Sequence, residues 1–305
     1  MGVHSFLRSA SAIVLAVGGA RGVKIIQSND DGWAEMYLRS FHTAMVDAGY
    51  DALVSAPADN ESARSSLDSD PTVRTTSCEY DSCAAGAAYG TNASDPSLNW
   101  VNSYPATSMR YGLDTFGPEY WGNGTLPDLA VTGPNVGSNV GFIQVEFSGT
   151  VGAACYAVDQ GIPAIAFSGI TEDRVAWNTV PVPTASLVYA DLALNLTNAI
   201  VASGTPYLPD DVFLNVNMAG VTDTSCTDAS DFKFVLSRIN IPTVLSTADV
   251  QTCNETWLPW EKDVVDAGCY VSVSVGTCSD KTDTDSAGQQ TVLDKLSSIL
   301  TCLPS

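Results

Sequence analysis

Residues 23–32 read VKIIQSNDDG, a β-branched apolar run that ends in two aspartates and a glycine. Valine and isoleucine favour a buried strand, whereas two consecutive carboxylates are costly at its end. At about 4 Å, two like charges repel by roughly 4 kcal/mol at an effective dielectric constant of ~20. A divalent cation held by Asp30 and Asp31 compensates this repulsion, provided that the chain turns at Gly32 so that both side chains reach one ion. The alternative is an Asp-rich turn in which Asp31 caps the next helix.

The composition is that of a folded and strongly acidic protein. The chain has 305 residues, of which 45% are hydrophobic, enough for one large α/β domain or two small ones. Its 34 acidic residues outnumber 13 basic ones and give a net charge of −21. This charge argues against nucleic-acid polymers and anionic membranes as partners. An anionic substrate needs a local positive centre, which a bound metal ion supplies.

The first 20 residues have the build of a secretory signal peptide. Arg8 precedes an apolar core, and small residues occupy positions 18–20, before the expected cleavage site. The apolar run is too short to span a bilayer, so we expect a soluble, secreted protein whose mature chain starts near Arg21. Five N-glycosylation sequons, which fit a secreted glycoprotein, begin at Asn60, Asn92, Asn123, Asn195 and Asn254.

Eight cysteines also agree with export into an oxidising compartment. Cys78 and Cys83 are near enough in sequence to close a small loop, whereas the connectivity of the others does not follow from their spacing. Cys155 lies in an apolar, helical stretch. For this residue a free buried thiol and a disulfide both remain open.

The order of apolar segments predicts an α/β fold. Expected strands at 23–28, 50–56, 129–132 and 163–168 alternate with expected helices at 34–48, 106–115 and 148–160. This alternation implies a parallel sheet with right-handed crossovers. Further strands are expected at 212–216, 232–239 and 270–275, and helices at 185–202 and 290–300. We therefore expect a catalytic core over 21–185 and a strand-rich extension over 186–305 that completes the same domain.

Three polar loops follow predicted strands of the core. They span residues 29–32, 56–62 and 132–139. Because ligands of open parallel sheets bind beyond the carboxyl ends of the strands, these loops are expected to converge. Carboxylate, hydroxyl and amide oxygens form a hard-oxygen site that suits Mg²⁺, Mn²⁺ or Ca²⁺ better than zinc.

A run of small residues, FSGTVGAA at 147–154, opens the helix expected at 148–160. A helix N-terminus with free N–H groups and hydroxyls is suited to phosphate binding. Alternatively, Ser148 is a plain N-cap, and the small residues allow close packing of the helix on the sheet.

The expected mature chain contains one histidine, His42, in the middle of a predicted helix. A structural role for His42 is favoured over a catalytic one. A phosphohistidine mechanism and a two-histidine metal site are therefore unsupported, whereas metal-assisted hydrolysis needs no histidine.

Four motifs occur in the order and spacing of the SurE-like phosphatases, also called the 5′/3′-nucleotidase family. They are VKIIQSNDDG, APADNES, PDLAVTGPNVGSN and SGTVGAACYAVDQGIPAIAFSG, within roughly residues 23–170. The chain resembles a secreted, fungal-type member of this family. The resemblance implies a doubly wound, Rossmann-like core with a C-terminal extension. It also implies a divalent-metal phosphomonoesterase acting on nucleoside monophosphates and related esters.

The resemblance also assigns roles to particular residues. The implied metal ligands are Asp30, Asp31, Ser62 and Asn135. The implied phosphate-side residues are Asn139, Ser148, Gly149 and Thr150, and Asn29 orients Asp30 or touches phosphate. Asp30, Asp31, Asn29, Ser148 and Thr150 are thus the expected catalytic residues.

Two departures from the family pattern affect the site. Bacterial members usually have glycine after the loop serine, whereas Ala63 and Arg64 follow here, and Arg64 either contacts phosphate or faces solvent. Bacterial members also tend to carry a late acidic residue and a late histidine. Asp263 is a loose match for the acid, and no histidine remains. Proton transfer would then differ from theirs or rely on metal-bound water.

The predicted function is a secreted phosphomonoesterase, similar to an acid phosphatase or a 5′-nucleotidase, with Mg²⁺ or Mn²⁺ as cofactor and Ca²⁺ as a further option. Its partner is a small phosphorylated substrate. The resemblance leaves a homodimer open, because the family commonly dimerises through its C-terminal extension. The alternative is a non-catalytic secreted protein that binds metal or a phosphate ligand. A serine esterase is disfavoured because the chain lacks a G-x-S-x-G elbow.

Overall fold

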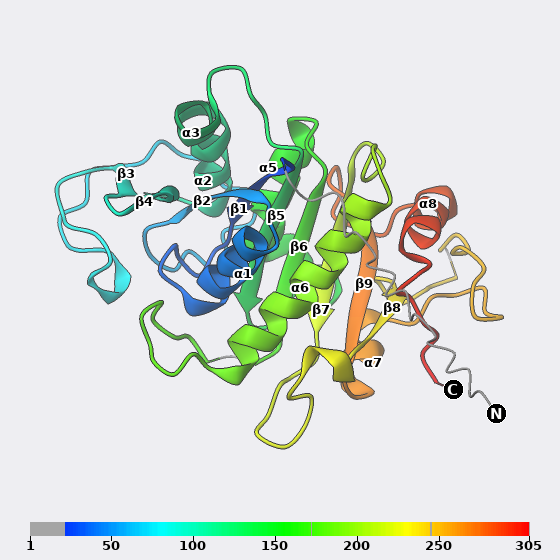
Figure 1. Ribbon diagram of the computed structural model, residues 1–305. Helices are drawn as coiled ribbons and strands as arrows, with labels where there is room; N and C mark the ends of the chain where they lie inside the picture. Colours follow the sequence, from blue (N-terminus) through cyan, green and yellow to red (C-terminus); the bar gives the residue numbers. More distant parts are fainter. Residues whose placement is uncertain (1–21, 172, 245, 305) are drawn as a thin grey trace, which may run out of the picture.

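The computed structural model describes residues 22–171, 173–244 and 246–304, which form one nine-stranded sheet covered by helices (Figure 1). The predicted signal peptide lies outside the described residues. The strands are β1 (Lys24–Ser28), β2 (Asp51–Pro57), β3 (Tyr89–Asn92), β4 (Asp95–Val101), β5 (Leu129–Val136), β6 (Ala164–Gly169), β7 (Val212–Met218), β8 (Lys233–Ser237) and β9 (Tyr270–Thr277). The helices are α1 (Met36–Asp47), α2 (Pro105–Tyr111), α3 (Gly117–Trp121), α4 (Gly141–Phe147), α5 (Gly149–Asp159), α6 (Thr184–Ala202), α7 (Glu261–Asp266) and α8 (Ser286–Leu296).

The sheet has the strand order β3-β4-β2-β1-β5-β6-β7-β9-β8. The strands from β4 to β7 in this order are parallel, while β3, β9 and β8 run in the opposite direction. The chain winds outward from β1 on both sides, so the predicted doubly wound, mostly parallel α/β fold is confirmed. The expected core and extension share this sheet, because β7 pairs with β6. The topological switch point lies between β1 and β5, where such sheets bind ligands.

Neighbouring side chains of β1 enter two different cores. Ile25 packs with Phe41 of α1 and with the buried face of α6, whereas Ile26 packs with α2 and α5 on the other face of the sheet. Of the helices in the described residues, α6 alone is long and apolar enough to cross a membrane. Its side chains Tyr189 and Leu192 are buried in the first core, so its apolar character is explained by packing.

Strand β5 is longer than the sequence predicts. The expected loop at Gly133 is part of the strand, and the register with β6 shifts between Thr132 and Asn135. Pro134 lies at this irregularity. A proline has no N–H to donate to the ladder, so a sheet tolerates it where regular pairing is interrupted. Gly133 has φ +94°, and a Cβ there would lie 2.2 Å from the carbonyl oxygen of Phe167. Asn135 is therefore fixed on a strand.

All eight cysteines form disulfides, which join Cys78 to Cys83, Cys155 to Cys278, Cys226 to Cys269 and Cys253 to Cys302. The expected Cys78–Cys83 loop is confirmed. The free-thiol alternative for Cys155 is wrong, since its Cα lies 5.2 Å from that of Cys278. The partner is 123 residues away in sequence, at the end of β9. Local sequence therefore held no sign of this pairing.

The Cys155–Cys278 bond should stabilise the fold more than the Cys78–Cys83 bond, because it closes a far longer loop. Replacing Cys155 and Cys278 by alanine should lower the free energy of unfolding by about 5 kcal/mol, whereas replacing Cys78 and Cys83 should lower it by roughly 2 kcal/mol. Urea unfolding followed by tryptophan fluorescence measures both double variants. Equal losses would contradict the loop-length argument.

Candidate active site

The paired aspartates lie in a tight turn directly after β1. Asn29 Nδ2 donates to Gly32 O at 3.1 Å, and Gly32 N donates to Asn29 Oδ1 at 3.2 Å. Gly32 has φ +112°, a conformation that favours glycine. The chain thus turns where the sequence requires it. Asn29 is fully buried and shapes this turn, which fits the expected role of orienting Asp30.

The N-terminal residues of α5 contact the side chain of Asp30. Thr150 Oγ1 donates to Asp30 Oδ1 at 2.6 Å. Burial raises the pKa of Asp30 above its ordinary value, while hydrogen bonds from the Thr150 hydroxyl and from the backbone of Thr150 and Gly149 oppose this rise. A Cβ on Gly149 would lie 2.9 Å from the Cβ of Asp30. The small residues of this helix therefore allow it to approach and hold the first aspartate.

Asp31 is held by the end of β5 rather than by the next helix. Its Oδ2 accepts a hydrogen bond from Val136 N at 2.8 Å. Burial, and next the charge of Asp30, raise the pKa of Asp31 well above its ordinary value. Helix α1 has Glu35 at its N-cap position. The alternative in which Asp31 caps this helix is therefore wrong.

A pocket of about 380 Å³ opens beside Asp30 at the switch point. Its other lining residues are Ser62, Ala63, Asn135, Val136, Gly137, Ser138, Asn139, Ile143, Gln144, Phe147 and Ser148. Ser62 is brought close because Glu61 N donates to Asp30 O at 2.7 Å. Asn135 Nδ2 donates to Gly137 O at 2.7 Å, so its Oδ1 is the amide atom suited to a cation. The three predicted polar loops thus converge.

In the described residues, the charges of Asp30 and Asp31 are only partly offset by a cationic side chain. No lysine, arginine or histidine there forms an ion pair with either carboxylate. The charge of Arg174 lowers the pKa of Asp31, but its Nη2 donates to the carbonyl oxygen of Asp31 at 2.7 Å, and burial still holds that pKa well above its ordinary value. Two buried carboxylates with hydroxyl and amide oxygens beside them fit a hard divalent cation. No group of three or more His, Cys, Asp or Glu side chains that could hold a metal ion occurs in the same ranges.

The expected phosphate-side residues divide into two groups. Ser148 and Asn139 line the pocket, whereas Gly149 and Thr150 support Asp30. Ser148 is the N-cap of α5, and its Oγ accepts from Val151 N at 3.2 Å, which leaves its own proton for a ligand. Asn139 is held through Nδ2, which donates to Ser168 Oγ at 2.8 Å.

Arg64 lies outside the residues that line the pocket. Its Nε donates to Glu61 Oε2 at 2.9 Å, and its guanidinium carbon lies 5.6 Å from the centre of the Tyr104 ring. A contact between Arg64 and phosphate therefore stays a prediction. His42 has the structural role expected of it, because it is buried, with Nε2 3.1 Å from Ser97 Oγ. Burial lowers the pKa of His42 to about 4.

Gln144 is a pocket residue that the sequence did not single out. Its Oε1 accepts from Val140 N at 2.6 Å and from Ser138 Oγ at 3.1 Å. With the oxygen used in this way, the Nε2 protons are the part of this amide that can donate to a ligand. Helix α4, which carries it, lies between the predicted loop at 132–139 and the predicted helix at 148–160, in a segment for which no element was predicted from the sequence.

The buried acid late in the chain is Glu261, whereas Asp263, two residues later, is exposed. Glu261 accepts hydrogen bonds from Gly141 N, from Asn215 Nδ2 at 2.9 Å and from Ser274 Oγ at 2.9 Å. Asn215 also donates to Asn139 O at 2.8 Å, so Glu261 anchors the loop that forms one side of the pocket. A usable signal was the segment FLNVN at 213–217, which places two asparagines on an otherwise apolar strand.

Comparison with known proteins agrees with this geometry. The family model described as Survival protein SurE matches residues 25–244. The chain belongs to the SurE family. The chain is 31% identical to an acid phosphatase of Yarrowia lipolytica over 293 residues, and this alignment covers 87% of the chain and 80% of the relative. It is 30% identical to the 5′-nucleotidase SurE of Lawsonia intracellularis, covering 66% of this chain and 67% of the relative.

A solved SurE structure shares the fold. The crystal structure of the SurE protein from Aquifex aeolicus superimposes with a TM-score of 0.57 at 20% identity, over 84% of this chain and 93% of that chain. The family model and the relatives confirm the predicted family, and these relatives carry the names of phosphomonoester hydrolases, the predicted enzyme class.

Glu79 joins the two SurE loops that carry Asp31 and Ser62. Its Oε2 accepts from Asn60 N at 3.1 Å, and its carboxylate pairs with Arg174 at 2.6 Å. Arg174 in turn holds the carbonyl oxygen of Asp31. Glu79 lies in the short segment closed by the Cys78–Cys83 disulfide, and its backbone N–H donates to Asp59 Oδ1 at 2.9 Å, so the disulfide and the loop of residues 56–62 together fix its position.

Replacing Glu79 by Gln should weaken Mn²⁺ binding by about tenfold without unfolding the protein, because the loops lose their common anchor. Isothermal titration calorimetry measures the affinity, and far-ultraviolet circular dichroism checks the fold. Glu119→Gln removes the same charge from an exposed position on α3 and serves as the matched control. Equal affinities of the two variants would exclude a positioning role for Glu79.

Glu261 should make the protein less stable as the pH rises. Burial raises the pKa of Glu261 to about 8 from an ordinary 4.5. The folded state therefore binds more protons than the unfolded state between these values, and stability falls with rising pH by up to about 1.4 kcal/mol per unit. Glu261→Gln should show a flatter dependence between pH 5 and pH 8 in urea unfolding. Parallel curves for the two proteins would contradict the raised pKa.

Proposed function

We propose that this protein is a secreted, divalent-metal-dependent phosphomonoesterase. The observation that carries this proposal is the pair of buried carboxylates, Asp30 and Asp31, at the switch point of the sheet, of which Asp30 lines an open pocket. Together with Ser62 and Asn135 they offer four hard-oxygen ligands. Mg²⁺ or Mn²⁺ fits this donor set, with Ca²⁺ as a further option.

A divalent cation at this position supplies positive charge that offsets the charge of a phosphate group and activates water. The protein's own residues have the tasks of holding and orienting. Thr150 fixes the carboxylate of Asp30 toward the start of α5. The Ser148 hydroxyl and the Gln144 amide offer protons to phosphoryl oxygens, where negative charge develops during hydrolysis. Glu261 acts at a distance by holding the segment that carries Asn139 and Gly141.

The relatives support the substrate class. An acid phosphatase and 5′-nucleotidases are similar to this chain over 66% to 87% of its length. A small phosphorylated molecule is therefore the proposed substrate. Secretion is supported by the signal-like sequence of residues 1–20 and by the pairing of all eight cysteines. A homodimer remains an expectation from the family.

Replacing Asp30 by Asn should abolish turnover, because it removes one of the two carboxylates and keeps the size of the side chain. We expect at least a roughly hundredfold loss of kcat/KM for glycerol 2-phosphate with Mg²⁺ or Mn²⁺, and loss of wild-type activity in EDTA. Asp263→Asn, at an exposed position on α7, is the matched control and should retain activity.

Two outcomes would contradict this proposal. Near wild-type activity of the Asp30 variant would show that the ligand assignment is wrong. Absence of metal-dependent turnover of every phosphate ester by the wild-type protein, with retained Mn²⁺ binding, would favour the alternative of a non-catalytic binding protein.

A further inference from the structure

Lys281 is a buried cation to which the proposed function assigns no task. It lies in the loop between β9 and α8, and it is the only buried lysine among the described residues. In that part of the chain it forms no ion pair with a carboxylate. A buried ammonium group is costly unless hydrogen bonds satisfy it, and burial lowers the pKa of Lys281. The groups that accept its hydrogen bonds therefore indicate its role.

The ammonium group of Lys281 joins two segments that are far apart in the sequence. Its Nζ donates to Ser65 Oγ at 2.7 Å and to Glu146 O at 3.1 Å. The Ser65 hydroxyl also donates to Glu146 O at 2.6 Å, and Ser65 N donates to Phe147 O at 3.0 Å. These hydrogen bonds tie the end of α4 to the loop that follows β2, and Lys281 donates two of them.

Both of the joined segments form walls of the catalytic pocket. Ser62 and Phe147, each together with the residue that follows it, line the pocket. Ser65 comes shortly after Ser62 in the first segment, and Glu146 comes directly before Phe147 in the second, which leads into α5. Lys281 therefore lies behind the pocket, where it holds the loop of a proposed metal ligand against the wall that begins α5.

The loop after β2 needs such an anchor because its backbone is strained. Ala63 has φ +59° and Ser65 has φ +51°, a left-handed conformation that residues with a side chain seldom adopt. Strained conformations of this kind persist where surrounding contacts hold them. The loop also packs closely on α5, since a Cβ at Gly152 would lie 1.9 Å from Ser65 O. The contacts of Ser65 with Lys281 and with α4 therefore help to keep the loop in its conformation.

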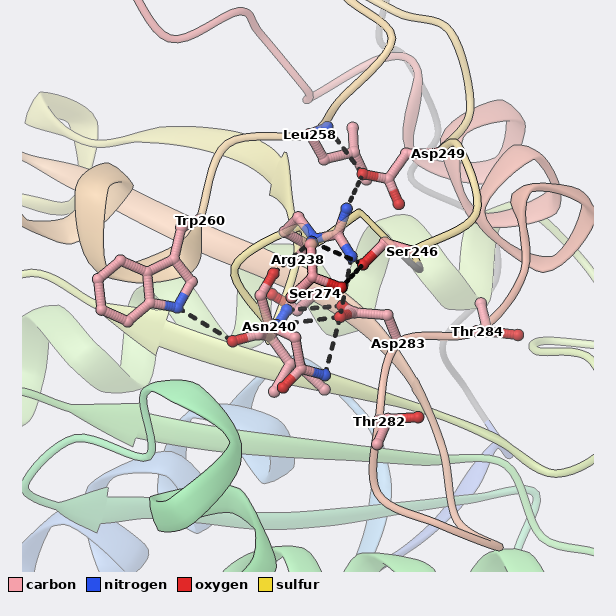
Figure 2. Close-up of polar contacts among 12 residues, drawn as sticks. Arg238, Asn240, Ser246, Asp249, Leu258, Trp260, Ser274, Thr282, Asp283 and Thr284 are labelled. Atoms are coloured by element: carbon pink, nitrogen blue, oxygen red, sulfur yellow. Dashed lines mark hydrogen bonds and ion pairs between the residues drawn. The ribbon is translucent and has the colours of Figure 1, made fainter.

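The loop that carries Lys281 is itself fixed on both sides of this residue. It begins at Cys278, which a disulfide joins to Cys155 of α5. Beyond Lys281, the Asp283 carboxylate accepts hydrogen bonds from Asn240 N at 3.0 Å and from Asn240 Nδ2 at 3.1 Å (Figure 2). The loop is thus attached to α5 at one end and to the segment after β8 at the other. Lys281 is therefore presented to the pocket walls from a rigid base.

We propose that Lys281 is a positioning residue, which sets how the loop of Ser62 lies against the start of α5 and so completes the metal site. This inference rests on the proposed function. An ammonium group suits the task because it has three N–H donors and can hold oxygen atoms of two segments at once. The strand-rich second half of the chain thereby takes part in forming a site whose lining comes from the first half.

The test is a double-variant cycle in which isothermal titration calorimetry measures the affinity for Mn²⁺. The four proteins are the wild type, Lys281→Met, Ser65→Ala and the variant with both changes. We expect Lys281→Met to weaken Mn²⁺ binding by about tenfold, as is usual when a group that supports metal ligands is removed. Ser65→Ala should weaken it as well. The double variant should lose no more than the larger single loss, because both changes break the same link.

Two further variants separate this role from a general effect on stability. Lys295 is a comparable lysine, whose Nζ donates to Gly204 O at 2.9 Å and to Ser203 Oγ at 3.3 Å, outside the pocket lining. Lys295→Met should therefore bind Mn²⁺ as the wild type does. Lys281→Arg keeps the positive charge and the N–H donors and should retain Mn²⁺ affinity within about threefold. Urea unfolding checks that each variant is folded under the conditions of the titration.

Three results would overturn the inference. They are unchanged Mn²⁺ affinity of Lys281→Met, single losses that multiply in the double variant, and an equal loss in Lys295→Met. If Lys281→Met does not fold, unchanged affinity of Ser65→Ala would overturn the inference in the same way. Failure of the proposed function would instead appear as Mn²⁺ binding by the wild type without turnover of glycerol 2-phosphate. Absence of Mn²⁺ binding to the wild type would overturn both.

Discussion

The structure depends on burying two adjacent carboxylates at the point where a parallel sheet reverses its winding order. A buried charge is costly unless it is hydrogen-bonded and paired. Thr150 of α5 donates to Asp30, and the backbone of Val136 at the end of β5 donates to Asp31, so each carboxylate is held by a different element. These hydrogen bonds come from neutral groups, and the pKa of both carboxyls stays raised. The divalent cation proposed for this site would supply the missing positive charge.

This constraint explains the long polar excursion between β2 and α2. Asp59 pairs with the buried Arg74 at 2.8 Å and accepts from Glu79 N at 2.9 Å. Glu79 then anchors the loops on both sides of it through Asn60 and Arg174. The segment has little regular structure of its own, yet its ion pairs fix backbone atoms near the metal ligands. The polar residues of this segment therefore have a structural role, which is to hold the neighbouring loops in place.

Local sequence was enough for the fold and for the centre of the site, because both depend on short-range patterns. Alternating apolar runs predicted the sheet, and the Asp30-Asp31-Gly32 turn lies where it was expected. Three features could not be predicted from local sequence, and the reason is the same for each. Glu261 is buried late in the chain, Gln144 lies in a segment for which no element was predicted, and Cys155 pairs across 123 residues. Each acquires its role only from partners that chain folding brings near.

The net charge of −21 affects a phosphate in the pocket less than its size suggests. At physiological ionic strength the Debye length is about 8 Å, so charges on distant surfaces act weakly there. Neutral donors that line the pocket, such as Ser148 and Gln144, contribute modestly against water. In the proposed function, the charge of the phosphate is therefore recognised chiefly by the cation.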